Sequence, residues 1–122
     1  MKILLIDDDP TDLKLFVQVL ESAGVEIIQA TNAEDGLARL KETKVDLVLV
    51  DILLPGMDGL AFARLVKSSP DFGNVPVVAT SAVTAWPFQR LSQMAGCDGF
   101  VQKPIDTRNL ARELQDVAKK NA

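Results

Sequence analysis

Three consecutive carboxylates follow an apolar run near the start of the chain. Residues 2–12 read KILLIDDDPTD, so four apolar residues end at Asp7, Asp8 and Asp9. Like charges this close repel one another where water is partly excluded. A divalent cation among them would offset the repulsion, and an all-oxygen donor set without nitrogen or sulfur favours Mg²⁺. The stretch therefore predicts a magnesium site.

Other polar side chains stand at the ends of later apolar runs. Asp51 ends the third run, Thr80 and Ser81 end the fourth, and Lys103 follows the fifth. In open α/β sheets the site lies beyond the carboxyl ends of the strands, where the strand order reverses. We expect carboxylates, a hydroxyl and an ammonium to meet there. Beside Mg²⁺ such groups can stabilise a phosphoryl group in transfer, and a carboxylate can accept it as an acyl phosphate.

Five apolar runs alternate with five helical patterns along the chain. The expected strands are Ile3–Ile6, Val25–Ala30, Leu47–Ile52, Val75–Thr80 and Phe100–Val101. The first, third and fourth are apolar throughout, as strands buried on both faces are. The second contains Glu26 and Gln29 and the fifth is short, so these two are the expected edges. This predicts an α/β fold, a (βα)5 doubly wound parallel sheet of order 2-1-3-4-5.

Helix signals lie between these runs. Asp9 and Asn32 are the expected caps of the first two helices, whereas Asp58 is expected to serve the turn GMDG. The fourth helix is expected over roughly residues 85–95, and the last one begins after Asp106. The apolar positions expected to face inward are Leu13, Phe16, Val17, Leu20, Leu37, Leu40, Phe62, Leu65, Val66, Leu91, Met94, Ala95, Leu110, Leu114, Val117 and Ala118.

Composition excludes several kinds of protein. The 122 residues, 48% hydrophobic and 25% charged, suit one soluble domain over residues 1–122. A net charge of −4 gives no sign of direct nucleic-acid binding, and no run approaches the ~20 apolar residues of a membrane span. Without histidine there is no imidazole metal site and no Ser-His-Asp or Cys-His nucleophile. Cys97 is the single cysteine, which predicts a reducing, cytoplasmic setting.

The chain resembles the receiver domain of two-component response regulators over essentially its whole length. The resemblance rests on IDDDP, VDILLPGMDG, PVVATSA and AGCDGFVQKPI, in that order and spacing. It implies a flavodoxin/CheY-like fold and Mg²⁺-dependent acceptance of a phosphoryl group on Asp51 from a histidine kinase or histidine phosphotransfer protein. It also implies a domain that catalyses only its own phosphorylation and dephosphorylation. Because the chain starts at Met1, we expect a stand-alone regulator that acts on a downstream protein target.

The resemblance also implies the metal ligands and the phosphoacceptor. Asp8 would bind Mg²⁺ directly and Asp7 would do so largely through water. Asp51 would be both a ligand and the phosphoacceptor. The backbone carbonyl of Leu53 would supply a further ligand.

Further roles are implied for residues near the ends of the fourth and fifth strands. Ser81 matches the hydroxyl that binds the phosphoryl group, because Ala82 follows it as in the family's S/T-A pair. Lys103 would contact the phosphoryl oxygens. Phe100 matches the aromatic residue that swings inward on activation. The bond between Lys103 and Pro104 matches one that the family holds cis.

The sequence departs from the family's usual pattern in two places. The S-A pair is followed by VTAWPFQR, which puts Trp86 and Phe88 near the start of the fourth helix. The family's output surface is the face of the fourth helix, fifth strand and fifth helix, so both aromatics are candidate partner contacts; alternatively, Trp86 folds over the sheet edge. The positions two residues after the acceptor and the hydroxyl are Leu53 and Val83. Both are apolar, which predicts a slowly hydrolysing acyl phosphate.

The strongest alternative is an enzyme. DDDPT also fits the D-x-D-x-T pattern of haloacid-dehalogenase-type phosphatases, with Asp7 as nucleophile and Asp9 as acid/base. That alternative leaves Asp51 without a role. A flavodoxin-like electron carrier shares the sheet order, but the acidic cluster disfavours a flavin phosphate. A receiver that no longer accepts phosphate is disfavoured because Asp51 and Lys103 are both intact.

Overall fold

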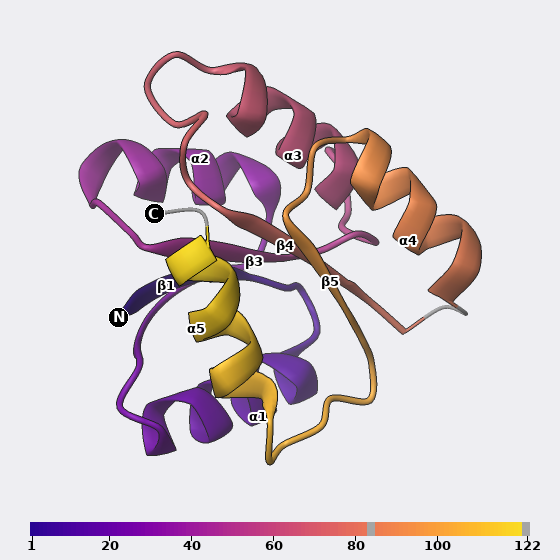
Figure 1. Ribbon diagram of the computed structural model, residues 1–122. Helices are drawn as coiled ribbons and strands as arrows, with labels where there is room; N and C mark the ends of the chain where they lie inside the picture. The colour runs from indigo at the N-terminus through magenta and orange to yellow at the C-terminus, as the bar shows by residue number, and fades with distance from the viewer. Residues whose placement is uncertain (83–84, 121–122) are drawn as a thin grey trace.

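The protein is an open sheet with helices on both faces, as the computed structural model shows (Figure 1). The structure describes residues 1–82 and 85–120, apart from the side chains of residues 85 and 86. The strands are β1 (Lys2–Ile6), β2 (Glu26–Ala30), β3 (Leu47–Asp51), β4 (Val77–Ser81) and β5 (Gly99–Gln102). The helices are α1 (Pro10–Ser22), α2 (Ala33–Glu42), α3 (Gly59–Ser68), α4 (Ala85–Met94) and α5 (Leu110–Lys120).

The strands pair in parallel in the order β2-β1-β3-β4-β5, which confirms the predicted order. β1 and β3 are neighbours, and Ile6 pairs with Val50. Asp7 and Asp51 each come directly after that pair, so the register brings the two carboxylates to adjacent strand ends. The boundaries of β4 differ from the prediction: it begins at Val77 and includes Ser81.

Each face of the sheet buries its own hydrophobic cluster. Helices α2, α3 and α4 cover one face, where Phe62 and Val66 pack against β3 and β4. Helices α1 and α5 cover the other face, where Phe16 and Leu114 are buried (Figure 1). Burying apolar side chains on both faces is the main stabilising contribution of such a sheet. It holds the strand ends in fixed positions relative to one another.

Three helices begin at polar caps. The carboxylate of Asp9 accepts a hydrogen bond from the Thr11 backbone N–H, and Asn32 caps α2 in the same way, as predicted. Asp58 was expected to serve only a turn, but its carboxylate accepts from the Ala61 N–H and caps α3. These caps satisfy backbone donors that have no partner within the helix.

The inward face of α4 was predicted incorrectly. Leu91 is 38% exposed and Met94 is 70% exposed, although both were expected to pack inward. Ser92 is buried instead, its hydroxyl donating to the Gln89 carbonyl, and Ala95 just after the helix is also buried. Successive helical residues are separated by about 100° around the axis. A rotation of α4 that buries Ser92 therefore turns Leu91 and Met94 toward solvent.

Two smaller corrections concern α3 and α5. Leu65 was expected inward, but it is 46% exposed because Phe62, Ala63 and Val66 fill the inner face of α3. The last helix begins at Leu110, not directly after Asp106. The intervening residues form a turn in which the Asp106 carbonyl accepts from the Leu110 N–H.

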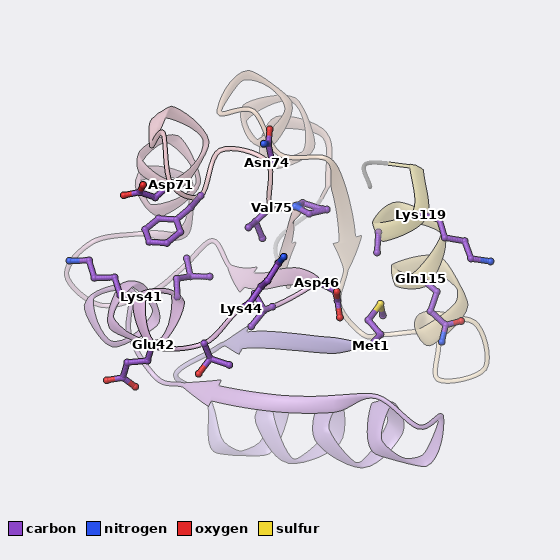
Figure 2. A pocket seen from close by; sticks show the side chains of 16 residues that line it. Met1, Lys41, Glu42, Lys44, Asp46, Asp71, Asn74, Val75, Gln115 and Lys119 are labelled. Atoms are coloured by element: carbon purple, nitrogen blue, oxygen red, sulfur yellow. The ribbon is translucent and has the colours of Figure 1, made fainter.

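A hollow of about 1120 Å³ lies at the amino ends of the strands (Figure 2). Met1, residues 43–46 and residues 74–76, which precede β1, β3 and β4, contribute to its lining. Lys41, Lys119 and other charged side chains stand around it. The carboxylates singled out in the sequence are at the opposite ends of these strands, so this hollow is separate from their site.

Candidate functional site

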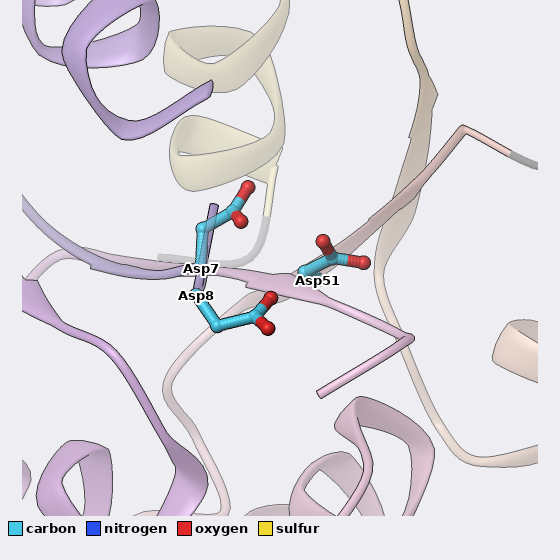
Figure 3. A group of neighbouring side chains, drawn as sticks. All are labelled: Asp7, Asp8 and Asp51. Atoms are coloured by element: carbon cyan, nitrogen blue, oxygen red, sulfur yellow. The ribbon is translucent and has the colours of Figure 1, made fainter. Parts of the chain in front are cut away.

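Three carboxylates gather at the carboxyl ends of β1 and β3 (Figure 3). Asp7 and Asp51 are buried, while Asp8 is exposed. One oxygen from each of the three side chains lies within 4.8 Å of the others. The sequence placed these residues together, and the structure brings them within reach of one shared cation.

The ammonium group of Lys103 lies between the carboxylates. Its Nζ donates to Asp7 Oδ2 at 2.9 Å and to Asp51 Oδ2 at 3.0 Å. A third bond joins it to Asp12 Oδ2 at 2.6 Å. Only 9% of the Lys103 side chain is exposed, so these charge-assisted bonds are shielded from water. The geometry makes Lys103 the central cation of the site.

The local charges shift two pKa values. Burial alone would lower the pKa of the Lys103 ammonium, but its hydrogen bonds to Asp12, Asp7 and Asp51 outweigh burial and raise it. Burial raises the pKa of the Asp7 carboxyl, opposed by bonds from the Asp9 N–H and from Lys103. The site therefore favours the charged form of Lys103, whereas for Asp7 burial makes the charged form costlier than in water.

Backbone donors fix how the two buried carboxylates point. Asp51 Oδ1 accepts from the Leu53 N–H at 3.0 Å, and Asp7 Oδ1 accepts from the Asp9 N–H at 2.9 Å. In each case the other oxygen binds Lys103. The turn after Asp51 therefore brings the Leu53 backbone next to the Asp51 carboxylate, while the Leu53 side chain is exposed.

Residues of β4 and β5 complete the surroundings. Ser81 is buried at the end of β4, and its carbonyl accepts from the Lys103 N–H at 2.9 Å. Thr80 precedes it and is buried; its hydroxyl has no hydrogen-bond partner in the part of the chain described. Phe100 on β5 is half-buried and packs against the cluster under α2, α3 and α4. The peptide bond between Lys103 and Pro104 is cis.

The candidate output residues are only partly described. Phe88 is half-buried against the same cluster as Phe100, so its ring packs on the core more than on solvent. The side chain of Trp86 and all of Val83 lie outside the described residues. The exposed apolar side chains of α4 in the described part include Leu91 and Met94, which sequence reasoning had assigned to the core.

Sequence reasoning missed Asp12. It lies in the first turn of α1, where an acidic residue is common because it opposes the helix dipole. Nothing in the local sequence indicates a bond to Lys103, which is 91 residues further along the chain. The only signal of this contact was the position of Asp12 five residues after Asp7, in a helix that begins next to the site.

Comparison with known proteins identifies the family. Residues 3–115 match the model of the response regulator receiver domain. The chain belongs to this family. It is 28% identical over 116 residues to PilH of Pseudomonas aeruginosa, an alignment that covers 95% of this chain and 96% of PilH. As a receiver domain, the chain is a component of two-component signalling.

Solved structures agree with this membership. A response regulator from Chloroflexus aurantiacus superposes with a TM-score of 0.93 at 25% identity over 97% of both chains. The receiver domain of a sensor histidine kinase from Pseudomonas aeruginosa, which has a magnesium ion coordinated in its active-site cleft, superposes with a TM-score of 0.88. At 24% identity over 97% of both chains, the second likeness shows a shared fold.

The phosphatase alternative finds no support in these comparisons. The structure also gives Asp9, the acid/base of that alternative, a different role, since this carboxylate caps α1.

The sequence showed no apolar run long enough to span a membrane. Within residues 1–82 and 85–120, no helix is long and apolar enough to cross a bilayer.

Replacing Asp7 with asparagine is expected to stabilise the metal-free receiver domain by about 1 kcal/mol. The raised pKa of Asp7 means that its ionised form destabilises the fold above that pKa. Asparagine removes this buried charge, and Lys103 keeps two other carboxylate partners, Asp12 and Asp51. Urea denaturation at pH 7 with a chelator present measures the change.

The matched control is Asp9→Asn, which removes an exposed charge and keeps a capping side chain. Its free energy of unfolding is expected to stay close to wild type. If Asp7→Asn were less stable than wild type, the bond between Asp7 and Lys103 would outweigh the cost of burying the carboxylate.

Proposed function

We propose that this receiver domain accepts a phosphoryl group on Asp51 from a histidine kinase or histidine phosphotransfer protein. The observation that carries the proposal is the Lys103 ammonium held between Asp7 and Asp51 at 2.9 and 3.0 Å. A carboxylate on a rigid strand end, beside a shielded positive charge, is suited to accept a negatively charged group. The chain would work as a single domain over residues 1–122.

Mg²⁺ is the proposed cofactor, and the side chains fit it. Asp7, Asp8 and Asp51 offer only oxygen atoms, which lie close enough to share one ion. Asp8 and Asp51 would hold the ion directly and Asp7 largely through water, with the Leu53 carbonyl as a further ligand. When bound, Mg²⁺ would supply positive charge that neutralises the phosphoryl oxygens. The magnesium-containing relative of similar fold supports this choice.

The transfer step uses the groups around Asp51. A carboxylate oxygen of Asp51 attacks phosphorus and forms an O–P bond, while the bond between phosphorus and the donor atom breaks. The bonding electrons leave with the donor, an imidazole nitrogen in the case of phosphohistidine. Lys103 shifts from the Asp51 carboxylate to an oxygen of the newly attached phosphoryl group. The Ser81 hydroxyl binds another of these oxygens.

Phosphorylation would then switch the face formed by α4, β5 and α5. New bonds from Ser81 and Lys103 to the phosphoryl group favour the state in which Phe100 packs inward. Phe100 and Lys103 are three residues apart at the end of β5, so movement at the site reaches this face directly. A downstream protein would bind the altered face.

The setting proposed for the protein is the cytoplasm, which suits the unpaired thiol of Cys97.

The test is incubation with acetyl phosphate and Mg²⁺, followed by intact-mass analysis and peptide mapping. One hydroxylamine-labile phosphoryl group on Asp51, absent with chelator and in Asp51→Asn, is the expected result. A label on Asp7 that persists in Asp51→Asn would support the phosphatase instead. No label with either acetyl phosphate or a phosphorylated histidine phosphotransfer protein would contradict the proposal.

The acyl phosphate is expected to hydrolyse slowly because Leu53 and Val83 offer no polar group to guide water. The side chain of Leu53, in the turn that follows Asp51, is exposed. The double variant Leu53→Asn with Val83→Glu is expected to hydrolyse roughly 10-fold faster by positioning a water molecule. Loss of the phosphoryl group after removal of acetyl phosphate measures the rate. An unchanged rate would mean that these side chains do not control access of water.

A further inference from the structure

The Asp12 carboxylate is committed to Lys103 and not to its own helix. Asp12 is the third residue after the cap Asp9, where an acidic side chain can turn back to the N–H of the cap residue. That N–H donates to Asp7 Oδ1 instead. Asp12 Oδ2 accepts from Lys103 Nζ at 2.6 Å, which is shorter than the bonds from the ammonium to Asp7 and Asp51.

Asp12 differs from the other two partners of Lys103 in its position. Its side chain is 32% exposed, whereas Asp7 and Asp51 are almost completely buried. Within the described residues, the carboxylates that can share a metal ion are Asp7, Asp8 and Asp51, so Asp12 lies outside that group. The Lys103 ammonium therefore connects the metal-binding carboxylates to a carboxylate at the rim.

We propose that Asp12 is a positioning residue for Lys103: it anchors the ammonium through a carboxylate outside the metal-binding group, so that the ammonium can release Asp7 and Asp51 to a divalent cation. The inference rests on the proposed function, in which Mg²⁺ and Lys103 use the same carboxylates. With Asp12 present, Lys103 has a partner that the metal ion does not take. The ammonium can then leave Asp7 and Asp51 and still stay beside the place of phosphoryl transfer.

Removing Asp12 should strengthen the competition between Lys103 and the metal ion. Three carboxylates share the ammonium in the wild type, and two share it when Asp12 is neutral. Both remaining partners are needed by Mg²⁺, and attraction between shielded charges is little weakened by salt. Mg²⁺ must then displace a more firmly held ammonium. A purely helix-stabilising Asp12 would instead change stability without any dependence on Lys103.

The experiment is a double-mutant cycle on Mg²⁺ affinity, measured by isothermal titration calorimetry with the full chain. The proteins are the wild type, Asp12→Asn, Lys103→Met and the double variant. Asp12→Asn is expected to weaken Mg²⁺ binding about five-fold when Lys103 is present and less than about two-fold when it is methionine. Lys103→Met alone is expected to bind Mg²⁺ more tightly than the wild type.

Asp9→Asn is the matched control, because it removes the same charge from the start of α1 while Asp9 binds the Thr11 N–H. It is expected to change Mg²⁺ affinity less than about two-fold in both backgrounds. Asp12→Ser gives a second neutral variant if Asp12→Asn does not fold. Equal losses with and without Lys103, or no loss on removing Asp12, would overturn the proposal.

These titrations need no phosphodonor, so the role of Asp12 and phosphoryl acceptance on Asp51 can be tested independently. An additive cycle together with a labelled Asp51 overturns the role of Asp12 alone. A coupled cycle without any label on Asp51 overturns phosphoryl acceptance and leaves the competition between Lys103 and Mg²⁺ standing. Failure of the wild type to bind Mg²⁺ at all would overturn both the metal site and the role of Asp12.

Discussion

Replacing Lys103 with methionine is expected to slow phosphoryl acceptance on Asp51 by roughly 10²-fold, the usual cost of losing a preorganised stabilising group. The ammonium lies 3.0 Å from Asp51 Oδ2, so it is already beside the place where the phosphoryl group and its negatively charged oxygens would arrive. Methionine keeps the apolar stem and removes only the charge. The rate of acyl phosphate formation from acetyl phosphate at saturating Mg²⁺ measures the loss. Saturation separates this rate from the tighter metal binding expected of the variant.

Lys14→Met is the matched control, because Lys14 is an exposed residue of α1 and its replacement removes the same charge. Its rate is expected to stay within about two-fold of the wild type, as for a surface charge screened by solvent. Comparable losses in both variants would show that Lys103 acts only through the net charge of the domain. An unaffected rate in Lys103→Met would remove Lys103 from the transfer step.

The arrangement of Asp7, Asp51 and Lys103 was predictable because it depends on strand order and little else. Apolar composition separated the central strands from the edges, and the sheet order then fixed which strand ends are neighbours. Each of the three residues directly ends or follows its strand, so no side-chain detail was needed. The exposed Asp8 lies near Asp7 and Asp51 for the same reason, since it follows Asp7.

Details that depend on helix rotation were less predictable. The contact from Asp12 to Lys103 requires the first turn of α1 to face the end of β5, and no periodicity in either segment carries that information. On α4 the apolar residues Leu91 and Met94 suggested the wrong inward face. A buried Ser92 can bind a carbonyl of its own helix, so a polar residue can face the core without an unpaired hydroxyl.

Replacing Gly59 with alanine is expected to destabilise the domain by about 3 kcal/mol, at the upper end for overpacking. A Cβ at Gly59 would lie 2.2 Å from the Asp51 carbonyl oxygen and 2.8 Å from the Ile52 Cα. These are backbone atoms of the β3 end, so no side-chain rotation relieves the contact. The Gly59 N–H also donates to the Ile52 carbonyl at 2.9 Å, which ties α3 to the same segment. Urea denaturation measures the loss.

Gly56→Ala, in the loop just before α3, is the matched control. Gly56 has a positive φ of 71°, so alanine there costs about 1–2 kcal/mol in backbone strain. Its Cβ would have only the Glu34 side chain nearby, at 3.9 Å, so the strand end stays in place. The two variants therefore separate strain from displacement of Asp51. Gly59→Ala is expected to weaken Mg²⁺ binding as well as the fold, whereas Gly56→Ala should lose stability alone. Equal Mg²⁺ affinities would show that α3 does not position Asp51.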